Sequence, residues 1–281
     1  MGIQISVLGS GSGGNSTLLC FPGEKRNRYV LIDAGFSPRE IRKRLDRLEV
    51  DPVDIEAILI THLHTDHFKE TWLSKCEHFS IDIYLHQRHV ESWVERGRSM
   101  KMVQVFEGDF SLFPDVSVQT MVLPHDQMGS IGFLFEHQSC RLGYLTDLGT
   151  VPRGVYDKLR GLDALAIESN YDTHLQANSR RPAVLKKRIM GQKGHLSNVQ
   201  SWEAVQQILQ QCALNQIIFL HLSRQCNAPR IIEELYAKRS PQLLPKLRYT
   251  DQFVPTPFLE IEAQARNALQ QPVERAQMKL L

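Results

Sequence analysis

The 281-residue sequence lacks any long hydrophobic run. Its longest apolar stretches, such as 57–60 and 217–220, have the length of a strand, whereas a membrane-spanning helix needs about 20 apolar residues. The chain also opens without the charged and apolar segments of a secretory signal. These absences predict a cytoplasmic protein without a membrane partner.

Cysteine is scarce and dispersed. The five cysteines are odd in number and form no Cys-x-x-Cys pair, which indicates reduced thiols rather than a disulfide framework. Repeats and low-complexity tracts are also absent. The net charge is only +2, so the overall charge does not point to a polyanionic partner. Any such partner has to be inferred from local clusters of charge.

Short apolar runs separated by turn residues predict strands in both halves of the chain, and each group of strands is followed by helices. This pattern predicts an α/β fold in which two mixed sheets pack together with helices outside. Residues 1–261 are expected to form a single domain, and 262–281 a C-terminal tail with a loosely docked helix. The expected strands are 3–8, 16–21, 29–32, 57–60, 81–85, 103–106, 116–122, 131–136, 141–146, 164–167 and 216–220. The expected helices begin at Ser37-Pro38 and cover 87–96, 155–159, 198–212 and 229–238.

The glycine-rich segment 9–14 matches the GxGxxG pattern of dinucleotide sites, and Asp33 follows at a suitable distance. Such a site requires a helix immediately after the glycines. Here residues 15–21 are strand-like and end at Pro22-Gly23. We therefore interpret the glycines as permitting a close backbone approach to a neighbouring loop or to an anionic substrate.

A cluster of histidines follows the apolar strand 57–60. In an extended chain, His62 and His64 project to the same side, and Asp66 and His67 come next as the chain turns. Imidazole and carboxylate groups without a thiolate suit borderline divalent cations. The alternative is a solvated turn that happens to be rich in histidine. With 11 histidines in the chain, three within six residues are improbable by chance, so the cluster indicates a metal site.

Three more polar residues directly follow apolar runs: His125, Asp147 and His221. A lone histidine in such a place is more often structural, but three residues in series favour metal ligands at one edge of a sheet. The set is large enough for two cations. Two cations about 3.5–4 Å apart share a hydroxide, lower its pKa and stabilise charge on the attacked group. The residues therefore predict a hydrolytic enzyme.

The order of these residues resembles the metallo-β-lactamase superfamily over residues 3–260. The resemblance implies a four-layer αββα sandwich and two divalent transition metals, zinc first, with manganese or iron as alternatives. Asp33 is implied to orient the ligand loop, and Asp66 counts as a catalytic residue as well as a ligand. The implied ligands are His62, His64 and His125 for one metal, Asp66, His67 and His221 for the other, and Asp147 as the bridge.

Further motifs resemble the bacterial WalJ/YycJ group within that superfamily. Members of this group are associated with exonuclease activity on DNA. The resemblance therefore implies a nucleic-acid substrate, with DNA favoured over RNA. The motifs lie at 11–16, 31–35, 146–149, 168–170, 187–189 and 194–198.

Hydrolysis also requires a proton for the leaving oxygen. His195 is the candidate, because related tRNA-processing enzymes use a histidine in a similar Gly-His context. Its alternative role is that of a residue at the start of a helix near Asn198. Glu168, at the end of the strand 164–167, is the candidate that orients His195, and its alternative is an ordinary carboxylate at a strand end.

The segment 178–198 carries six basic residues and no acidic residue. A solvated face is the ordinary interpretation, but this run leads to His195 in a nearly neutral chain. Phosphate oxygens are the natural counter-charge. The predicted phosphate contacts are Arg180, Lys186, Lys187, Arg188, Ser197 and Asn198.

Three functions remain open from the residues. The first is a metal-dependent hydrolase of phosphodiester bonds, specifically a DNA exonuclease that uses a metal-bridging hydroxide. The second is a hydrolase of a small lactone, thioester or lactam with the same dinuclear site. The third is a metal-bound sensor or scaffold without activity. The basic segment favours the first, and the complete ligand set argues against the third.

Overall fold

The computed structural model describes residues 2–264 and arranges fourteen strands in two seven-stranded sheets. The strands are β1 (Ile3–Gly9), β2 (Ser16–Phe21), β3 (Arg28–Ile32), β4 (Ile55–Leu59), β5 (Asp82–His86), β6 (Val103–Phe106), β7 (Phe110–Phe113), β8 (Val116–Leu123), β9 (Ser130–His137), β10 (Cys140–Leu145), β11 (Ala164–Glu168), β12 (Gln216–Leu220), β13 (Leu247–Tyr249) and β14 (Leu259–Ile261). The first sheet has the order β14-β1-β2-β3-β4-β5-β6 and the second β13-β12-β11-β10-β9-β8-β7.

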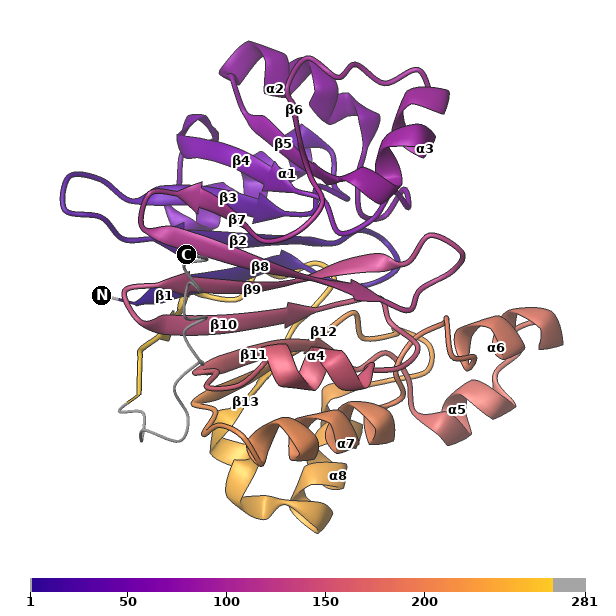
Figure 1. Cartoon of the computed structure of the whole chain (residues 1–281). Helices are drawn as coiled ribbons and strands as arrows, with labels where there is room; N and C mark the ends of the chain where they lie inside the picture. Colours follow the sequence, from indigo (N-terminus) through magenta and orange to yellow (C-terminus); the bar gives the residue numbers. More distant parts are fainter. Residues whose placement is uncertain (1, 265–281) are drawn as a thin grey trace, which may run out of the picture.

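Helices cover the outer faces of both sheets. They are α1 (Pro38–Leu45), α2 (Leu73–Phe79), α3 (Val90–Glu95), α4 (Arg153–Lys158), α5 (Thr173–Asn178), α6 (Ala183–Ile189), α7 (Asn198–Leu209) and α8 (Pro229–Arg239). Figure 1 shows α1, α2 and α3 on the first sheet, α4, α7 and α8 on the second, and α5 and α6 at one end of the molecule. The start of α1 is as predicted, because the Ser37 side chain accepts the N–H of Glu40 and Pro38 is the first helical residue.

Three apolar clusters hold these layers together. One lies between the sheets and the other two lie under the two sets of helices. Neighbouring residues of a strand serve different clusters, since Leu19 packs between the sheets and Leu18 packs under the helices of the first sheet. Across the sheets, the hydroxyls of Thr17 and Tyr144 are 3.1 Å apart. The predicted four-layer αββα sandwich is confirmed.

The strand directions bring several chain segments to one edge of the sandwich. In the first sheet β3 to β6 are parallel, and in the second β10 to β13 are parallel. β8 runs the same way as β10, because both are antiparallel to β9. The predicted site residues therefore lie at the carboxyl ends of strands, namely β3, β4, β8, β10, β11 and β12. Ligands of parallel sheets usually bind at this end of the strands.

Two predictions about the chain remain untested. The helix predicted in the C-terminal tail falls mostly outside the described residues, which end at 264. The single domain predicted for residues 1–261 also stays a prediction. Within residues 2–264, none of the helices combines the length and the apolar character needed to cross a bilayer.

Candidate metal centre

All seven side chains predicted as metal ligands meet at this edge. Their nitrogen and oxygen atoms form overlapping groups in which the atoms lie within 4.8 Å of one another. We call one group the imidazole half, which is His62, His64 and His125, and another the carboxylate half, which is Asp66, His67 and His221. Asp147 joins the halves, because one of its oxygens lies 3.1 Å from His67 Nε2 and the other 3.9 Å from His125 Nε2.

Left-handed backbone occurs at three strand ends beside the centre. Asp33 follows β3 with φ 62°, Asp147 follows β10 with φ 51°, and His221 follows β12 with φ 55°. Residues other than glycine rarely adopt this region, and each such residue costs about 1–3 kcal/mol. Such strained backbone persists mainly at functional sites, where it directs a side chain toward the site. The side chains of these three residues point toward the metal centre or its ligands.

Three buried imidazole nitrogens show that the residues fit a metal. The Nε2 atoms of His62, His125 and His221 are buried and have no hydrogen-bond partner among the described residues. Their other ring nitrogens are engaged, since His125 Nδ1 donates to the Gly194 carbonyl at 3.0 Å and His221 Nδ1 lies 2.9 Å from Glu168 Oε1. With the proton on Nδ1, the Nε2 atom of a neutral ring presents a lone pair to the centre. A buried lone pair without a partner is unfavourable, and a divalent cation satisfies it.

Asp33 orients one of these ligands from behind. Its carboxylate lies 2.7 Å from His67 Nδ1 and accepts the Thr61 N–H at 2.8 Å, and it is fully buried. A carboxylate on the far nitrogen fixes the tautomer and direction of a ligating histidine. This contact corresponds to the orienting role that the resemblance implies for Asp33. Thr61, which also contacts His62 Nδ1 at 3.0 Å, was not singled out from the sequence.

The two halves differ in their electrostatics. In the imidazole half, burial and the neighbouring histidines hold the pKa of His62 well below its ordinary value and also lower the pKa of His64. In the carboxylate half, burial alone would lower the pKa of His67 and His221. Asp147 and further carboxylates outweigh it, and they raise the pKa of His67 well above its usual range and that of His221 to about 10. The carboxylate half therefore attracts positive charge.

The glycine-rich segment supports the turn that holds Asp66 and His67. The Asn15 N–H donates to the Asp66 carbonyl at 2.7 Å, and the Asn15 side-chain oxygen accepts the Gly11 N–H at 2.8 Å. A Cβ on Gly14, whose φ is 148°, would lie 2.9 Å from the Gly35 carbonyl oxygen, and a Cβ on Gly35 would lie 1.8 Å from the Asp66 carbonyl oxygen, so glycine is required at both positions. The glycines thus permit contact with a neighbouring loop, and β2 rather than a helix follows them.

His195 lies beside the carboxylate half. Its Nδ1 is 2.7 Å from Glu168 Oε1, the same oxygen that contacts His221 Nδ1. Glu168 is fully buried, and its other oxygen accepts the N–H groups of Leu148 and Leu196. The His195 side chain is 19% exposed, so it is accessible to a substrate. Glu168 therefore orients both the predicted proton donor and a predicted metal ligand.

Part of the basic segment borders a groove that reaches the imidazole half. The groove has a volume of about 810 Å³ and is lined by Lys187, Arg188 and Lys193 together with Asp126. Asp126 lies 3.0 Å from His64 Nε2, which links the groove to the metal centre. We call it the basic groove. Arg180 is exposed at the beginning of the same segment.

The other predicted phosphate contacts have partners within the protein. Lys186 Nζ donates to the carbonyls of Ala177 and Ser179. Ser197 is the N-cap of α7, where its side chain accepts the Gln200 N–H. Asn198 is buried and bonds to Ser169 and Asn227. Lys186 therefore contacts the end of α5, whereas Ser197 and Asn198 support the segment that follows His195.

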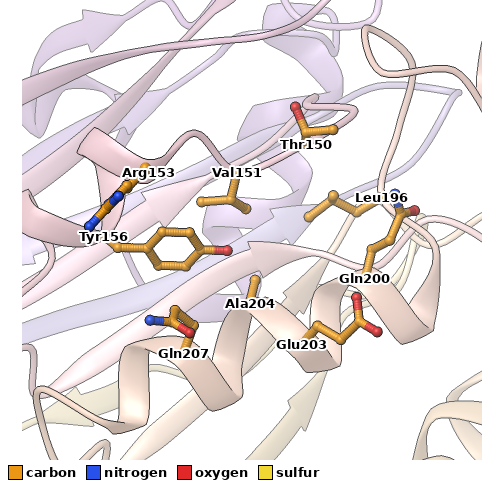
Figure 2. Close-up of a pocket in the computed structure, with 9 residues that line it drawn as sticks. All are labelled: Thr150, Val151, Arg153, Tyr156, Leu196, Gln200, Glu203, Ala204 and Gln207. Atoms are coloured by element: carbon orange, nitrogen blue, oxygen red, sulfur yellow. The ribbon is translucent and has the colours of Figure 1, made fainter.

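A second cavity adjoins the carboxylate half and contains residues that the sequence analysis missed. It has a volume of about 450 Å³, and its lining includes His195, His221 and Arg181. Arg181 and Lys186 belong to the same basic run of the sequence. The fold places Arg181, but not Lys186, in the lining of this cavity. Another pocket of about 590 Å³ lies between α4 and α7 (Figure 2) and contains none of the predicted ligands. Its charged lining residues are Arg153 and Glu203.

Comparisons with known proteins agree with this geometry. A sequence profile described as a beta-lactamase superfamily domain matches residues 28–222. Exodeoxyribonuclease WalJ of Streptococcus pneumoniae serotype 2 is 29% identical over 233 residues, which cover 81% of this chain and 84% of that protein. Exodeoxyribonuclease YycJ of Bacillus anthracis is 28% identical over 201 residues, with coverage of 70% and 74%. The crystal structure of a diphosphatase from the PhnP family aligns with a TM-score of 0.64 and 18% identity, covering 93% of this chain and 98% of that one, and this likeness shows the fold alone.

Proposed function

The chain belongs to the metallo-β-lactamase superfamily and is a metal-dependent hydrolase, and from this premise we propose that it cleaves phosphodiester bonds of DNA as an exonuclease. The basic groove carries the proposal. Lys187, Arg188 and Lys193 border the approach to the imidazole half, and a polyanionic strand gives these cations a partner. A neutral lactam, lactone or thioester has no charge to meet them. The similarity to two proteins named exodeoxyribonucleases supports DNA as the polymer.

We assign one divalent cation to each half of the centre, zinc first, with manganese or iron as alternatives. His62, His64 and His125 hold one, Asp66, His67 and His221 hold the other, and Asp147 lies between them. Bound there, two cations supply an activated water and offset charge on the attacked phosphate. Asp66 belongs to the catalytic machinery as the carboxylate ligand. Burial opposes its ionisation, but His221 and His67 lower the pKa of Asp66 to about 2, so it is ionised at neutral pH.

His195 acts as the proton donor in this proposal. As an imidazolium it gives its Nε2 proton to the leaving oxygen, while Nδ1–H stays bonded to Glu168 at 2.7 Å. Glu168 stabilises the charged ring and fixes its direction. Because Glu168 Oε1 also contacts His221, the donor is held in a fixed position relative to the carboxylate half.

The test is a substrate comparison with the metal-loaded protein. End-labelled single- and double-stranded DNA, RNA, a small nitrophenyl phosphodiester, a lactone and a thioester are each incubated with added zinc or manganese. We expect stepwise shortening of DNA from an end and slower action on RNA. A protein that hydrolyses the lactone or thioester and leaves every strand intact would contradict the proposal and favour the small-molecule hydrolase.

A further inference from the structure

Helix α6 separates two approaches to the metal centre. On one side, Lys187 and Arg188 line the basic groove. On the other, Leu185 and Ile189 line the cavity of about 450 Å³ beside the carboxylate half. Leu185 and Ile189 are four residues apart and so share one face of the helix. We call this cavity the α6 pocket. The two sides of one short helix therefore present different chemistry to the same centre.

The α6 pocket combines aliphatic and fixed polar groups. Arg181 is held by three hydrogen bonds, to Gln176 Oε1 at 2.9 Å, to Ser223 Oγ at 3.3 Å and to Gln225 Oε1 at 3.2 Å. Gln176 is fully buried, so it anchors the guanidinium. A planar guanidinium held in place can stack on a flat ring and contact oxygens. Aliphatic walls with a few fixed polar groups are typical of sites for small ring-containing ligands.

The size and position of the pocket indicate which part of a strand enters it. Sites for small ligands have volumes of about 300–1,000 Å³, so 450 Å³ accommodates one nucleoside but no duplex. His195 lines the pocket, and it is the group that protonates the leaving oxygen in the proposed function. The substituent that carries the leaving oxygen must therefore lie on this side of α6.

We propose, resting on the proposed function, that the α6 pocket binds the single terminal nucleoside that departs with the leaving oxygen, while the basic groove holds the rest of the strand. Water forms the new bond to phosphorus, the bond from phosphorus to the terminal nucleoside breaks, and His195 delivers a proton to the released oxygen. The cleaved phosphate therefore stays on the shortened strand. A pocket that holds a single nucleoside also explains why cleavage starts at an end.

Product analysis tests this assignment without a variant. Wild-type protein digests an oligonucleotide in water enriched in oxygen-18, and mass spectrometry locates the labelled phosphate. We expect the label on the shortened strand after the first cleavage. A label on the released nucleotide overturns the pocket assignment, although the DNA has been cleaved and the proposed function stands. Failure to shorten any strand overturns the proposed function itself and the assignment with it.

A matched pair of variants tests the pocket directly. Leu185→Trp fills the pocket, whereas Val184→Trp places the same ring at the adjacent position of α6, which is 82% exposed. The readout is the rate on a normal end divided by the rate on an end whose terminal residue lacks its base. We expect wild type and Val184→Trp to favour the normal end about tenfold, the scale of one base contact, and Leu185→Trp to lose the preference. A ratio near one in wild type, or equal ratios in the two variants, overturns the pocket assignment.

Discussion

The imidazole half and the carboxylate half of the centre are adjacent, yet their protons behave in opposite ways. In the imidazole half, burial and like-charged neighbours lower the pKa of His62 and His64, so the rings are neutral and ready to bind a cation. In the carboxylate half, Asp147 and its neighbours raise the pKa of His67 and His221 despite burial. A cation entering the carboxylate half therefore has to displace protons, but it gains stronger attraction from ionised ligands.

The surroundings of the two halves differ as well. The imidazole half continues through Asp126 into the basic groove, and the carboxylate half continues through Glu168 to His195 and the α6 pocket. In the proposed function, binding of a polyanion and protonation of the leaving group therefore take place on opposite sides of α6. Changes on one side should therefore leave the function of the other side intact, and each of the following experiments tests this separation.

The largest effect is expected from Asp147, because it touches both halves. Asp147→Ala should lose metal from both and abolish hydrolysis of DNA and of a small phosphodiester. Asp147→Asn keeps the shape of the side chain but removes its negative charge, which faces His67 and His221. It should therefore also lose metal, mainly from the carboxylate half. Metal content per chain and turnover are the measurements. Full occupancy with full turnover in Asp147→Ala would show that the two halves do not share this residue.

His195 should affect the rate and spare the metals. His195→Ala is expected to retain both cations and to lose about 10²–10⁴-fold in rate, the usual contribution of a general acid. The loss should be smaller with a nitrophenyl leaving group, which departs without a proton. Loss of metal from His195→Ala would instead make His195 a ligand of the carboxylate half.

The pH dependence of metal affinity should separate the halves. The pKa of His221 is raised to about 10, so below that pH the metal-free protein holds a proton that a cation must displace. Affinity of the carboxylate half should therefore fall as pH falls, by about tenfold per pH unit for each displaced proton, and His67, whose pKa is also raised, supplies a second proton. His62 and His64 have lowered pKa values, so the affinity of the imidazole half should fall less steeply with pH than that of the carboxylate half. His125→Ala and His221→Ala each keep one half intact, and chelator competition measures each alone. Parallel pH curves would contradict the electrostatic contrast.

The smallest expected effect is a change in the salt dependence of DNA binding, and it should be confined to variants of the basic groove. Each phosphate contact contributes a slope of about −0.7 to −0.9 in log affinity against log salt. A catalytically inactive, metal-bound variant with Lys187→Ala and Arg188→Ala should therefore show a slope flatter by about 1.5 units. Lys186→Ala is the matched control, because Lys186 bonds to two carbonyls of the protein and should leave the slope unchanged. Equal slopes in all three proteins would remove the basic groove from DNA binding.

Most of the site could be predicted from the sequence, because its histidines and aspartates follow apolar runs of strand length. β6 spans the predicted residues 103–106, and His125, Asp147 and His221 follow predicted strands. The short strands β7, β13 and β14 were missed. Helices α2, α5 and α6 were missed as well, and α5 and α6 bury no apolar side chain that could have marked them. The distinction between Lys186 and Arg181 depends on how α6 is rotated, which composition does not encode.

The central claim is that both halves must hold a cation before a strand is cut. The most direct test adds zinc or manganese stepwise to metal-free protein while bound metal and shortening of end-labelled DNA are followed together. The account predicts that DNA cleavage rises mainly with the second equivalent and reaches its maximum at two metals per chain. Full DNA cleavage at one equivalent, or two bound metals with intact DNA, would contradict it.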